Sequence, residues 1–244
     1  MLCPPETLDA NLAYRADLLN ACALHGPFRK EVIARAATDL RFLCSSFLFT
    51  YDPRRTPPDR PFLLWPHEDE KIVARLDNAY QFRHDLLIEK SRDMGVTWTI
   101  LMWLLWRWRF DAGFQAIIGS RLEDLIDRHG NIQTHFERLR WELRLLPAWL
   151  LPEGYEEGRH ALYMRLLNPA SGNAIVGEAV TDGFSRQGRY NIAFLDEFAF
   201  CESSENAWRA TADSAPMRLA VSSPNGLGNK FAALRRSGTI EVVT

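Results

Sequence analysis

The sequence predicts an α/β fold, with a mostly parallel sheet covered by helices on both faces and a helical region at the N-terminus. From about residue 61 onward, short apolar runs alternate with helical segments, a pattern typical of βαβ units. A length of 244 residues with 47% hydrophobic and 25% charged residues allows a large core and excludes a disordered or low-complexity chain. The formal net charge of −2 gives no overall basic field, although a basic stripe on one face remains possible.

The N-terminal residues 1–60 are predicted to form a helical region followed by a linker. Residues 7–22 and 28–49 carry apolar residues at helical spacing, and Gly26 and Pro27 separate them. Residues 52–61 contain four prolines and three arginines in ten positions, which predicts an extended linker. We therefore expect two parts, residues 1–60 and a core of residues 61–244.

The core is predicted to alternate strands and helices along the chain. Strands are expected at 86–88, 115–118, 192–195, 219–221 and 239–244, helices at 97–109 and 122–145, and a β-hairpin at 161–167 and 173–180 around the turn 168–172. In parallel sheets of this kind, ligands bind at the carboxyl ends of the strands.

The cysteine pattern and the hydropathy argue against a disulfide-rich protein and against a membrane-spanning one. The four cysteines are scattered without metal-ligand spacing, so we expect reduced thiols in a cytosolic protein. The most apolar run, 99–106, is too short to span a bilayer and predicts a buried helix. Four tryptophans fall on or just beside this run, and core packing explains them better than base stacking: Trp98, Trp103, Trp106 and Trp108.

One polar loop follows the strand at 86–88 and reads Lys90-Ser-Arg-Asp-Met-Gly-Val-Thr-Trp98. A loop with Gly95 before a helix that opens at Thr97 presents free N–H groups to an anion. Compared with a P-loop, Val96 stands where the lysine is expected, but Lys90 and Arg92 supply cations nearby. The alternative is a plain strand-to-helix turn with solvent-facing charges.

A second polar loop begins where the strand at 192–195 ends in Asp196 and Glu197. One carboxylate at such a strand end can hold magnesium, and the next can activate water for attack on a phosphate. Two solvated acids at an exposed strand end are the alternative.

A third polar loop, Ser222-Ser-Pro-Asn-Gly226, follows the strand at 219–221. Its two hydroxyls can hydrogen-bond a phosphate or its attacking water, whereas a plain turn is the simpler explanation when the loop is taken alone. The three loops in this order make a common site the better interpretation.

Together these motifs resemble the ATPase domain of the large terminase subunit of tailed bacteriophages, over residues 61–244. The resemblance implies a P-loop NTPase fold of the ASCE type, with the N-terminal region as a helical lid. In that family the lysine of the phosphate loop can stand at its front, as Lys90 does here. The implied nucleotide-binding residues are Lys90, Ser91, Arg92, Asp93, Met94, Gly95, Val96, Thr97 and Glu68.

The same resemblance assigns chemical roles. Thr97 and Asp196 would hold Mg²⁺, Glu197 would be the catalytic general base, and Ser222 and Ser223 would form the motif that couples to the γ-phosphate. Glu68, in the segment Leu64-Trp-Pro-His-Glu68, occupies the adenine-side position at which many relatives have glutamine.

An arginine supplied by a neighbouring subunit also belongs to this family's chemistry. The segment Gly183-Phe-Ser-Arg-Gln-Gly-Arg189 lies where that residue is expected. We favour Arg186 as the catalytic arginine, with Arg189 second. A surface arginine in a flexible loop is the alternative.

The implied function is Mg²⁺-dependent ATP hydrolysis that powers translocation of double-stranded viral DNA into the procapsid. The implied cofactors are ATP and Mg²⁺. The partners are DNA bound without sequence preference, the portal protein, the small terminase subunit and further copies in a ring; for the isolated chain a monomer stays open. No membrane partner, a location in the host cytoplasm and no DNA cleavage by this chain are expected. A degenerate nucleotide-binding or scaffold module and a helicase-like ATPase are the alternatives.

The DNA-contacting residues are harder to predict. Five arginines lie on or near the segment 121–144 with acidic residues interleaved: Arg121, Arg128, Arg138, Arg140 and Arg144. Mixed charges on a helix favour a solvated face with local ion pairs.

Overall fold

The computed structural model describes residues 2–65, 68–91 and 94–244. The chain forms two compact units, one of Met1–Asp69 with Trp141–Leu151 and one of Glu70–Arg140 with Pro152–Thr244. Each unit is described separately below. The expected division at residue 60 into a lid region and an ATPase core stays a prediction. No helix in the described part of the chain is both long enough and apolar enough to cross a bilayer.

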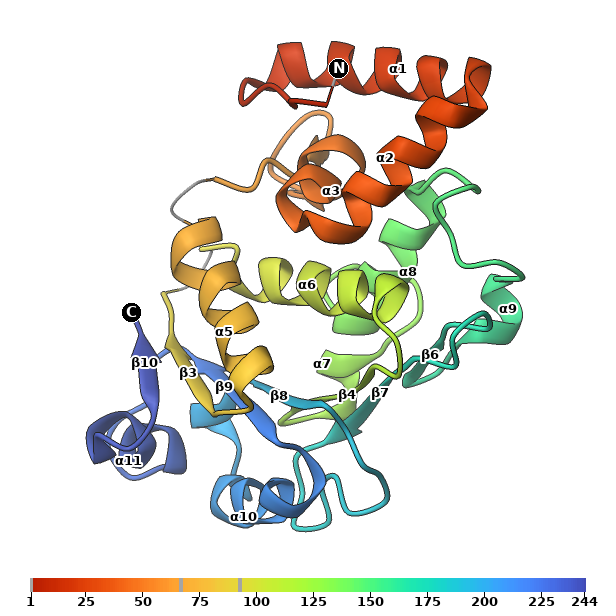
Figure 1. The fold of residues 1–244 in the computed structure, drawn as a ribbon. Coiled ribbons are helices and arrows are strands. Elements are labelled where there is room, and N and C mark those ends of the chain that lie inside the picture. The colour runs from red at the N-terminus through yellow and green to blue at the C-terminus, as the bar shows by residue number, and fades with distance from the viewer. Residues whose placement is uncertain (1, 66–67, 92–93) are drawn as a thin grey trace. The chain divides into compact units, whose positions relative to one another are not determined.

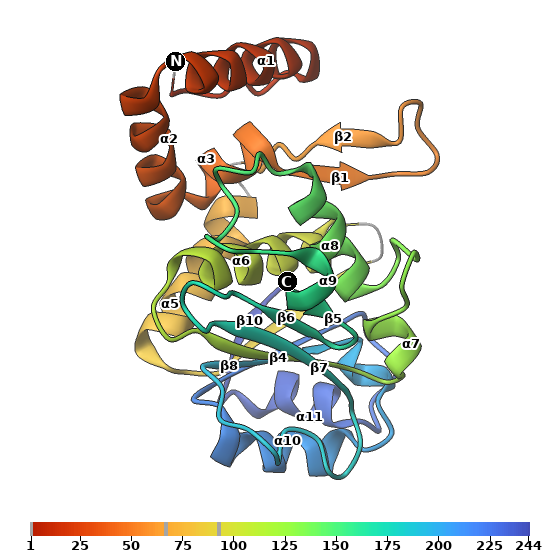
Figure 2. The same ribbon diagram turned by 90° about the vertical axis from the view of Figure 1, so that its right-hand side faces the viewer.

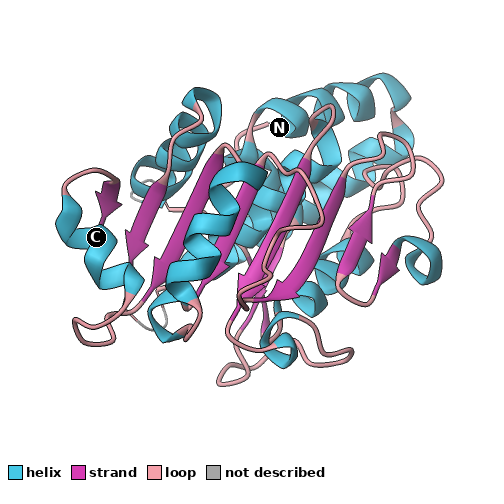
Figure 3. Ribbon diagram, turned by 90° about the horizontal axis from the view of Figure 1, so that it is seen from below, coloured by secondary structure: helices cyan, strands magenta, loops and turns pink. Residues whose placement is uncertain are grey.

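Among the described residues, the second unit is built on an eight-stranded sheet in the order β10-β3-β9-β8-β4-β7-β6-β5. Figure 3 shows the strands of this sheet side by side, in magenta. All neighbouring pairs from β10 to β7 are parallel, whereas β6 pairs antiparallel with both β7 and β5. The strands are β3 (Leu86–Glu89), β4 (Gln115–Ser120), β5 (Ala161–Leu162), β6 (Arg165–Leu167), β7 (Ala174–Ala179), β8 (Ile192–Asp196), β9 (Met217–Ser222) and β10 (Glu241–Val243). The predicted mostly parallel sheet is confirmed.

Helices cover both faces of this sheet (Figures 1 and 2), as predicted: α5 (Ala74–Phe82) and α6 (Val96–Phe110) lie on one face, and α10 (Ser204–Ser214) and α11 (Lys230–Ser237) on the other. The shorter elements are η1 (Asp69–Val73), α7 (Glu123–Ile126), α9 (Glu157–His160) and the 3₁₀ turn η2 (Phe198–Phe200). Helices α5, α10 and α11 were not predicted, because their apolar residues are sparse and their signal is weaker than that of α6.

Burial explains why α6 and the central strands are continuously apolar. Every residue of β8 is buried, as expected for a parallel strand covered on both faces. Helix α6 is buried on nearly all sides, and all four of the tryptophans on or near its sequence run are at most 8% exposed. Such a helix is hydrophobic all round because no face meets water. The predictions of a buried helix and of tryptophan packing are confirmed.

In its described residues, the first unit contains three N-terminal helices, a two-stranded hairpin and the C-terminal part of α8 (His135–Leu145). Its elements are α1 (Leu8–Leu24), α2 (Gly26–Thr38), α3 (Leu40–Phe47), β1 (Phe49–Tyr51) and β2 (Asp59–Pro61). The helix predicted over 28–49 is in fact two helices and a strand, because Asp39 caps the N-terminus of α3 by accepting a hydrogen bond from the Phe42 N–H. The expected extended linker at 52–61 is also wrong, since β1 and β2 pair antiparallel across it, with Tyr51 opposite Asp59.

A buried polar cluster lies inside the first unit. The Arg15 guanidinium donates to Asn11 Oδ1 at 2.7 Å and to the Cys44 carbonyl at 2.9 Å. Burial lowers the pKa of Arg15 to about 10, and the charge of Glu142 opposes that shift. Glu142 is itself fully buried and accepts the Phe49 N–H at 3.2 Å. These hydrogen bonds offset part of the cost of burying the two charged groups, although Arg15 Nη1 has no hydrogen-bond partner among the described residues.

The long helix predicted over 122–145 is broken into two. Helix α7 ends at Ile126 and α8 (His135–Leu145) begins nine residues later, after a turn in which Gly130 has a φ of 76°. The expected solvated charged face is also wrong in part, because Arg140 pairs with Asp127 and, at 2.9 Å, with Glu137, and all three are buried.

Candidate functional site

The three polar loops singled out in the sequence follow three adjacent parallel strands. β9 lies between β3 and β8, with Glu89 opposite Ser222 and Asp196 opposite Val221. The carboxyl ends of these strands therefore lie side by side, and they place Lys90, Asp196 and Ser222 at one edge of the sheet. The topology itself brings the predicted loops together.

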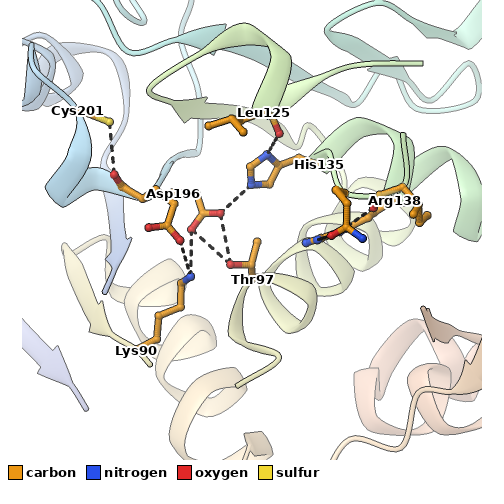
Figure 4. Close-up of polar contacts among 10 residues, drawn as sticks. Lys90, Thr97, Leu125, His135, Arg138, Asp196 and Cys201 are labelled. Atoms are coloured by element: carbon orange, nitrogen blue, oxygen red, sulfur yellow. Dashed lines mark hydrogen bonds and ion pairs between the residues drawn. The ribbon is translucent and has the colours of Figure 1, made fainter. Parts of the chain in front are cut away.

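Lys90 is held at this edge through both its backbone and its side chain. Its N–H donates to the Ser222 carbonyl at 3.0 Å and so extends the ladder between β3 and β9 by one residue. Its Nζ lies 2.9 Å from Glu197 Oε1 and 4.0 Å from Asp196 Oδ1 (Figure 4). The side chain is only 12% exposed, so this ammonium group sits between two carboxylates with little access to water.

The loop after Lys90 leads into the N-terminus of α6. Gly95 caps the helix at a φ of 72°, a left-handed conformation that glycine adopts without strain. The Val96 side chain is buried, at 7% exposure, and so cannot serve the role of a P-loop lysine, while Met94 is 58% exposed. Arg92 and Asp93, both predicted to bind nucleotide, lie outside the described residues. Ser91 is exposed at the mouth of the loop.

Asp196 is the centre of the cluster. It is 5% exposed, and the Thr97 hydroxyl lies 3.4 Å from both of its carboxylate oxygens. His135 Nε2 lies 2.8 Å from Oδ2. Burial alone raises the pKa of Asp196, but the hydrogen bond and charge of His135 and the charge of Lys90 outweigh it, so the carboxyl pKa lies below its ordinary value. Asp196 is therefore a buried anion stabilised by its neighbours.

His135 was missed in the sequence analysis; it lies 61 residues before Asp196 and begins helix α8. Its Nδ1 lies 2.9 Å from the Leu125 carbonyl, and its ring meets Phe194 edge-on, with centroids 6.1 Å apart. The Leu125 carbonyl at one nitrogen and the Asp196 carboxylate at the other hold the ring in place. A single histidine among charged residues carries no motif that would reveal this contact.

Arg138 lies one helical turn beyond His135. Its guanidinium lies over the ring of Trp98, 4.9 Å from the centroid, and its Nε donates to the Ile132 carbonyl at 3.1 Å. Burial lowers the pKa of Arg138, and the charge of Asp196 opposes this shift. Arg138, one of the five arginines that the sequence places near this segment, thus lies within electrostatic reach of Asp196.

Glu197 adopts an unusual backbone conformation directly after β8. Its φ of 52° and ψ of 37° are left-handed, which costs a non-glycine residue roughly 1–2 kcal/mol and is concentrated at functional sites. The side chain is 35% exposed and reaches Lys90. The Cys201 thiol lies 3.7 Å from the Glu197 carbonyl, and burial, with the charge of Asp196, raises the pKa of Cys201 to about 12.

Ser222 connects two of the loops. Its Oγ accepts the Ala199 N–H at 3.1 Å, while its carbonyl accepts the Lys90 N–H. Asn225 adds a bond from its side-chain amide to the Ala199 carbonyl at 3.1 Å. Ser223 follows at the end of β9 and is half-buried. Ser222 thus joins the segment after Glu197 to the backbone of Lys90 through two hydrogen bonds.

Two further predicted residues are Arg186 and Glu68. Arg186 is exposed and lines an open cavity of about 700 Å³ with Arg189 and Arg209. Glu68 belongs to the first unit, where its carboxylate accepts the Trp65 N–H at 3.0 Å. The roles assigned to Arg186 and Glu68 stay predictions.

The donor set fits a magnesium ion shared with a phosphate ligand. A threonine hydroxyl and a carboxylate are oxygen ligands of the kind Mg²⁺ takes, and Mg²⁺ keeps waters and phosphate oxygens in its other positions. In the described part of the chain no group of three or more His, Cys, Asp or Glu residues is arranged to hold a metal ion alone. The N-terminus of α6, with its positive end of the helix dipole, and the Lys90 ammonium are suited to the phosphates.

Comparison with solved structures identifies the fold. The large terminase of bacteriophage HK97 matches with a TM-score of 0.58 and 15% sequence identity over 85% of this chain. The chain has the fold of a large-terminase ATPase domain. It spans 43% of the length of the HK97 protein.

Two further solved structures match with lower TM-scores. The large terminase ATPase domain of Thermus phage P74-26 matches with a TM-score of 0.43 and 19% identity, over 60% of this chain and 62% of that one. A mutant form of the same domain matches with a TM-score of 0.42, 18% identity and the same coverage. These two weaker matches carry no further argument. Neither a scan of protein-family models nor a search of curated proteins gave a match.

Proposed function

We propose that this chain is the motor domain of a large terminase, which hydrolyses ATP with Mg²⁺ to translocate double-stranded viral DNA into the procapsid. The observation that carries the proposal is the convergence of Lys90, Asp196 and Glu197, which follow or end strands β3 and β8, with Thr97 in the first turn of α6. The likeness of the fold to the HK97 large terminase supports the same function. Neither of these two observations requires a lysine at the position of Val96, where a P-loop has one.

In this proposal the phosphate loop works with its cation at the front. Lys90 exchanges its Glu197 partner for the β- and γ-phosphates, and Val96 packs in the core. The other described residues of the phosphate loop are Ser91, Met94 and Gly95. The N-terminal N–H groups of α6 add positive potential at the same place.

The carboxylates divide the remaining chemistry. Asp196 and Thr97 hold Mg²⁺, which when bound neutralises charge on the phosphates. Glu197 accepts a proton from the attacking water, a role to which its partly exposed position beside buried Asp196 is suited. Ser222 and Ser223 couple the γ-phosphate to the rest of the sheet, and Ser222 already joins Lys90 to the segment after Glu197.

Arg186 completes the site of a neighbouring copy in an assembled ring. Its exposure in an open cavity, lined by arginines and by Asp182 and Asp213, suits a residue that acts in trans. Hydrolysis is then weak in the isolated chain and strong in the assembly, since such arginines accelerate phosphoryl transfer by roughly 10³–10⁵. DNA bound without sequence preference, the portal protein and the small terminase subunit are the other partners, met in the host cytoplasm.

Calorimetric titration of ATP with Mg²⁺ into the wild type and Lys90→Ala tests this function. Charge-assisted contacts to phosphate contribute about 1.5–3 kcal/mol, so the variant should bind at least about tenfold more weakly. Lys230→Ala is the matched control, because it removes another paired lysine, 3.1 Å from Glu205 and outside this cluster.

Each result decides between functions. Wild-type binding that is lost in Lys90→Ala and kept in Lys230→Ala supports a working phosphate loop. Wild-type protein that binds no ATP at millimolar concentration refutes the proposal as it stands. The degenerate scaffold module then becomes the better candidate, and the buried Val96 in the lysine position is the observation that favours it.

A further inference from the structure

His135 is fixed on three sides beside Asp196. Its two ring nitrogens lie 2.8 Å from Asp196 Oδ2 and 2.9 Å from the Leu125 carbonyl (Figure 4). Phe194 packs against its ring. The side chain is 7% exposed. A ring anchored at a backbone carbonyl and buried in this way has a single orientation available toward the carboxylate.

This contact determines how Asp196 presents its oxygens. Oδ2 is engaged by His135, while Oδ1 faces Lys90 Nζ at 4.0 Å and both oxygens lie 3.4 Å from the Thr97 hydroxyl. The Glu197 backbone N–H is a further hydrogen-bond partner of the carboxylate, but His135 makes the shortest side-chain contact to it, so removing the histidine loosens the orientation of Oδ2. Hydrogen bonds of this kind, made to a metal-binding carboxylate, typically change metal affinity or activity by about 10–100-fold when removed.

We propose that His135 is a positioning residue that orients Asp196 for Mg²⁺, an inference that rests on the proposed ATPase function. It acts through the carboxylate and touches neither metal nor nucleotide. A histidine with a purely structural role would change stability and leave the Mg²⁺ dependence of nucleotide binding unmoved. The Mg²⁺ concentration that half-saturates ATP binding is therefore the decisive quantity.

Two substitutions separate the two hydrogen bonds of His135. The amide nitrogen of asparagine sits where Nδ1 does, so His135→Asn can keep the Leu125 contact and loses the reach to Asp196. The amide nitrogen of glutamine extends to the position of Nε2, so His135→Gln can keep the donor to Asp196. Thermal unfolding followed by circular dichroism establishes that each variant is folded.

The measurement is ATP binding by calorimetry across a Mg²⁺ series, with an EDTA arm for metal-free ATP. For His135→Asn we expect the Mg²⁺ midpoint to rise by about 10–100-fold with metal-free ATP binding unchanged. For His135→Gln we expect a midpoint close to that of the wild type. His84→Asn is the control: its ring nitrogens also lie near two acceptors, the Asp85 carbonyl at 3.1 Å and Asn78 Oδ1 at 3.0 Å, but just before the start of β3.

The possible results distinguish a failure of the role proposed for His135 from a failure of the proposed ATPase function. A folded His135→Asn variant with the wild-type midpoint overturns the inference, as does a folded His135→Gln variant whose midpoint rises about tenfold or more. The glutamine variant decides the question if the asparagine variant does not fold. Wild-type protein whose ATP binding does not respond to Mg²⁺ refutes the proposed function instead.

Discussion

Glu197→Gln should abolish ATP hydrolysis and at the same time tighten ATP binding. Glu197 Oε1 lies 2.9 Å from Lys90 Nζ. If Lys90 moves to the phosphates on binding, this ion pair must break, and its energy is subtracted from the affinity. Glutamine removes the charge that holds the lysine while keeping the size of the side chain.

The magnitude follows from the exposure of the pair. Lys90 is 12% and Glu197 35% exposed, so the pair lies at the upper end of the range for accessible ion pairs, about 1 kcal/mol. Removing it should tighten ATP binding about fivefold. Loss of a general base should slow hydrolysis by about 10²–10⁴.

Calorimetry gives the affinity, and release of inorganic phosphate at several protein concentrations gives the rate. Glu205→Gln is the matched control, since Glu205 pairs with Lys230 at 3.1 Å on α10 and should change neither quantity. Weaker ATP binding by Glu197→Gln would refute the idea that the ion pair competes with the nucleotide. Unchanged hydrolysis would refute the role of Glu197 as the base.

Three further predictions concern other parts of the second unit. Arg186→Ala should lower the hydrolysis rate of concentrated protein by roughly 10³ or more without changing ATP binding, and a wild-type rate in this variant would exclude Arg186 as the trans arginine. Gly119→Ala should reduce the free energy of unfolding, measured in urea, by about 1–3 kcal/mol, because the added Cβ would come within 2.6 Å of Phe184 Cζ. Gly158→Ala is the control and should be nearly neutral, because there is open space around Gly158. Equal stability of the two variants would contradict this packing. The pKa of the Cys201 thiol is raised to about 12, so the thiol should be almost entirely protonated at about pH 8. It should therefore react far more slowly with a thiol reagent than an exposed cysteine does. Rapid labelling of Cys201, mapped by mass spectrometry, would contradict its burial.

The strands and the predicted loops were accessible from the sequence because their signals are local. An apolar run that ends abruptly in Asp196 and Glu197 predicts both a buried strand and its polar end, and β8 ends at Asp196 as expected. Helix α6 begins at Val96 and ends at Phe110, within one residue of the prediction. Parallel topology then requires such strand ends to meet.

Burial of charged residues was not accessible in the same way. Asp127, Glu137 and Arg140 look in sequence like an exposed face with ion pairs, yet each is at most 4% exposed. What buries them comes from elsewhere in the chain: Asp127 accepts the Met164 N–H at 2.7 Å. Interleaved charges give the same sequence pattern whether or not another segment covers them.

The broken helix and the missed histidine have one cause. Leu125 and His135 are ten residues apart, so in a continuous helix they would be separated by about 15 Å along the axis. The turn at Gly130 folds the chain back instead, and His135 Nδ1 reaches the Leu125 carbonyl at 2.9 Å. The same reversal aims Nε2 at Asp196. A prediction that keeps residues 122–145 helical therefore cannot place His135 at the site. Recognising His135 as a site residue would have required recognising the turn at Gly130 first.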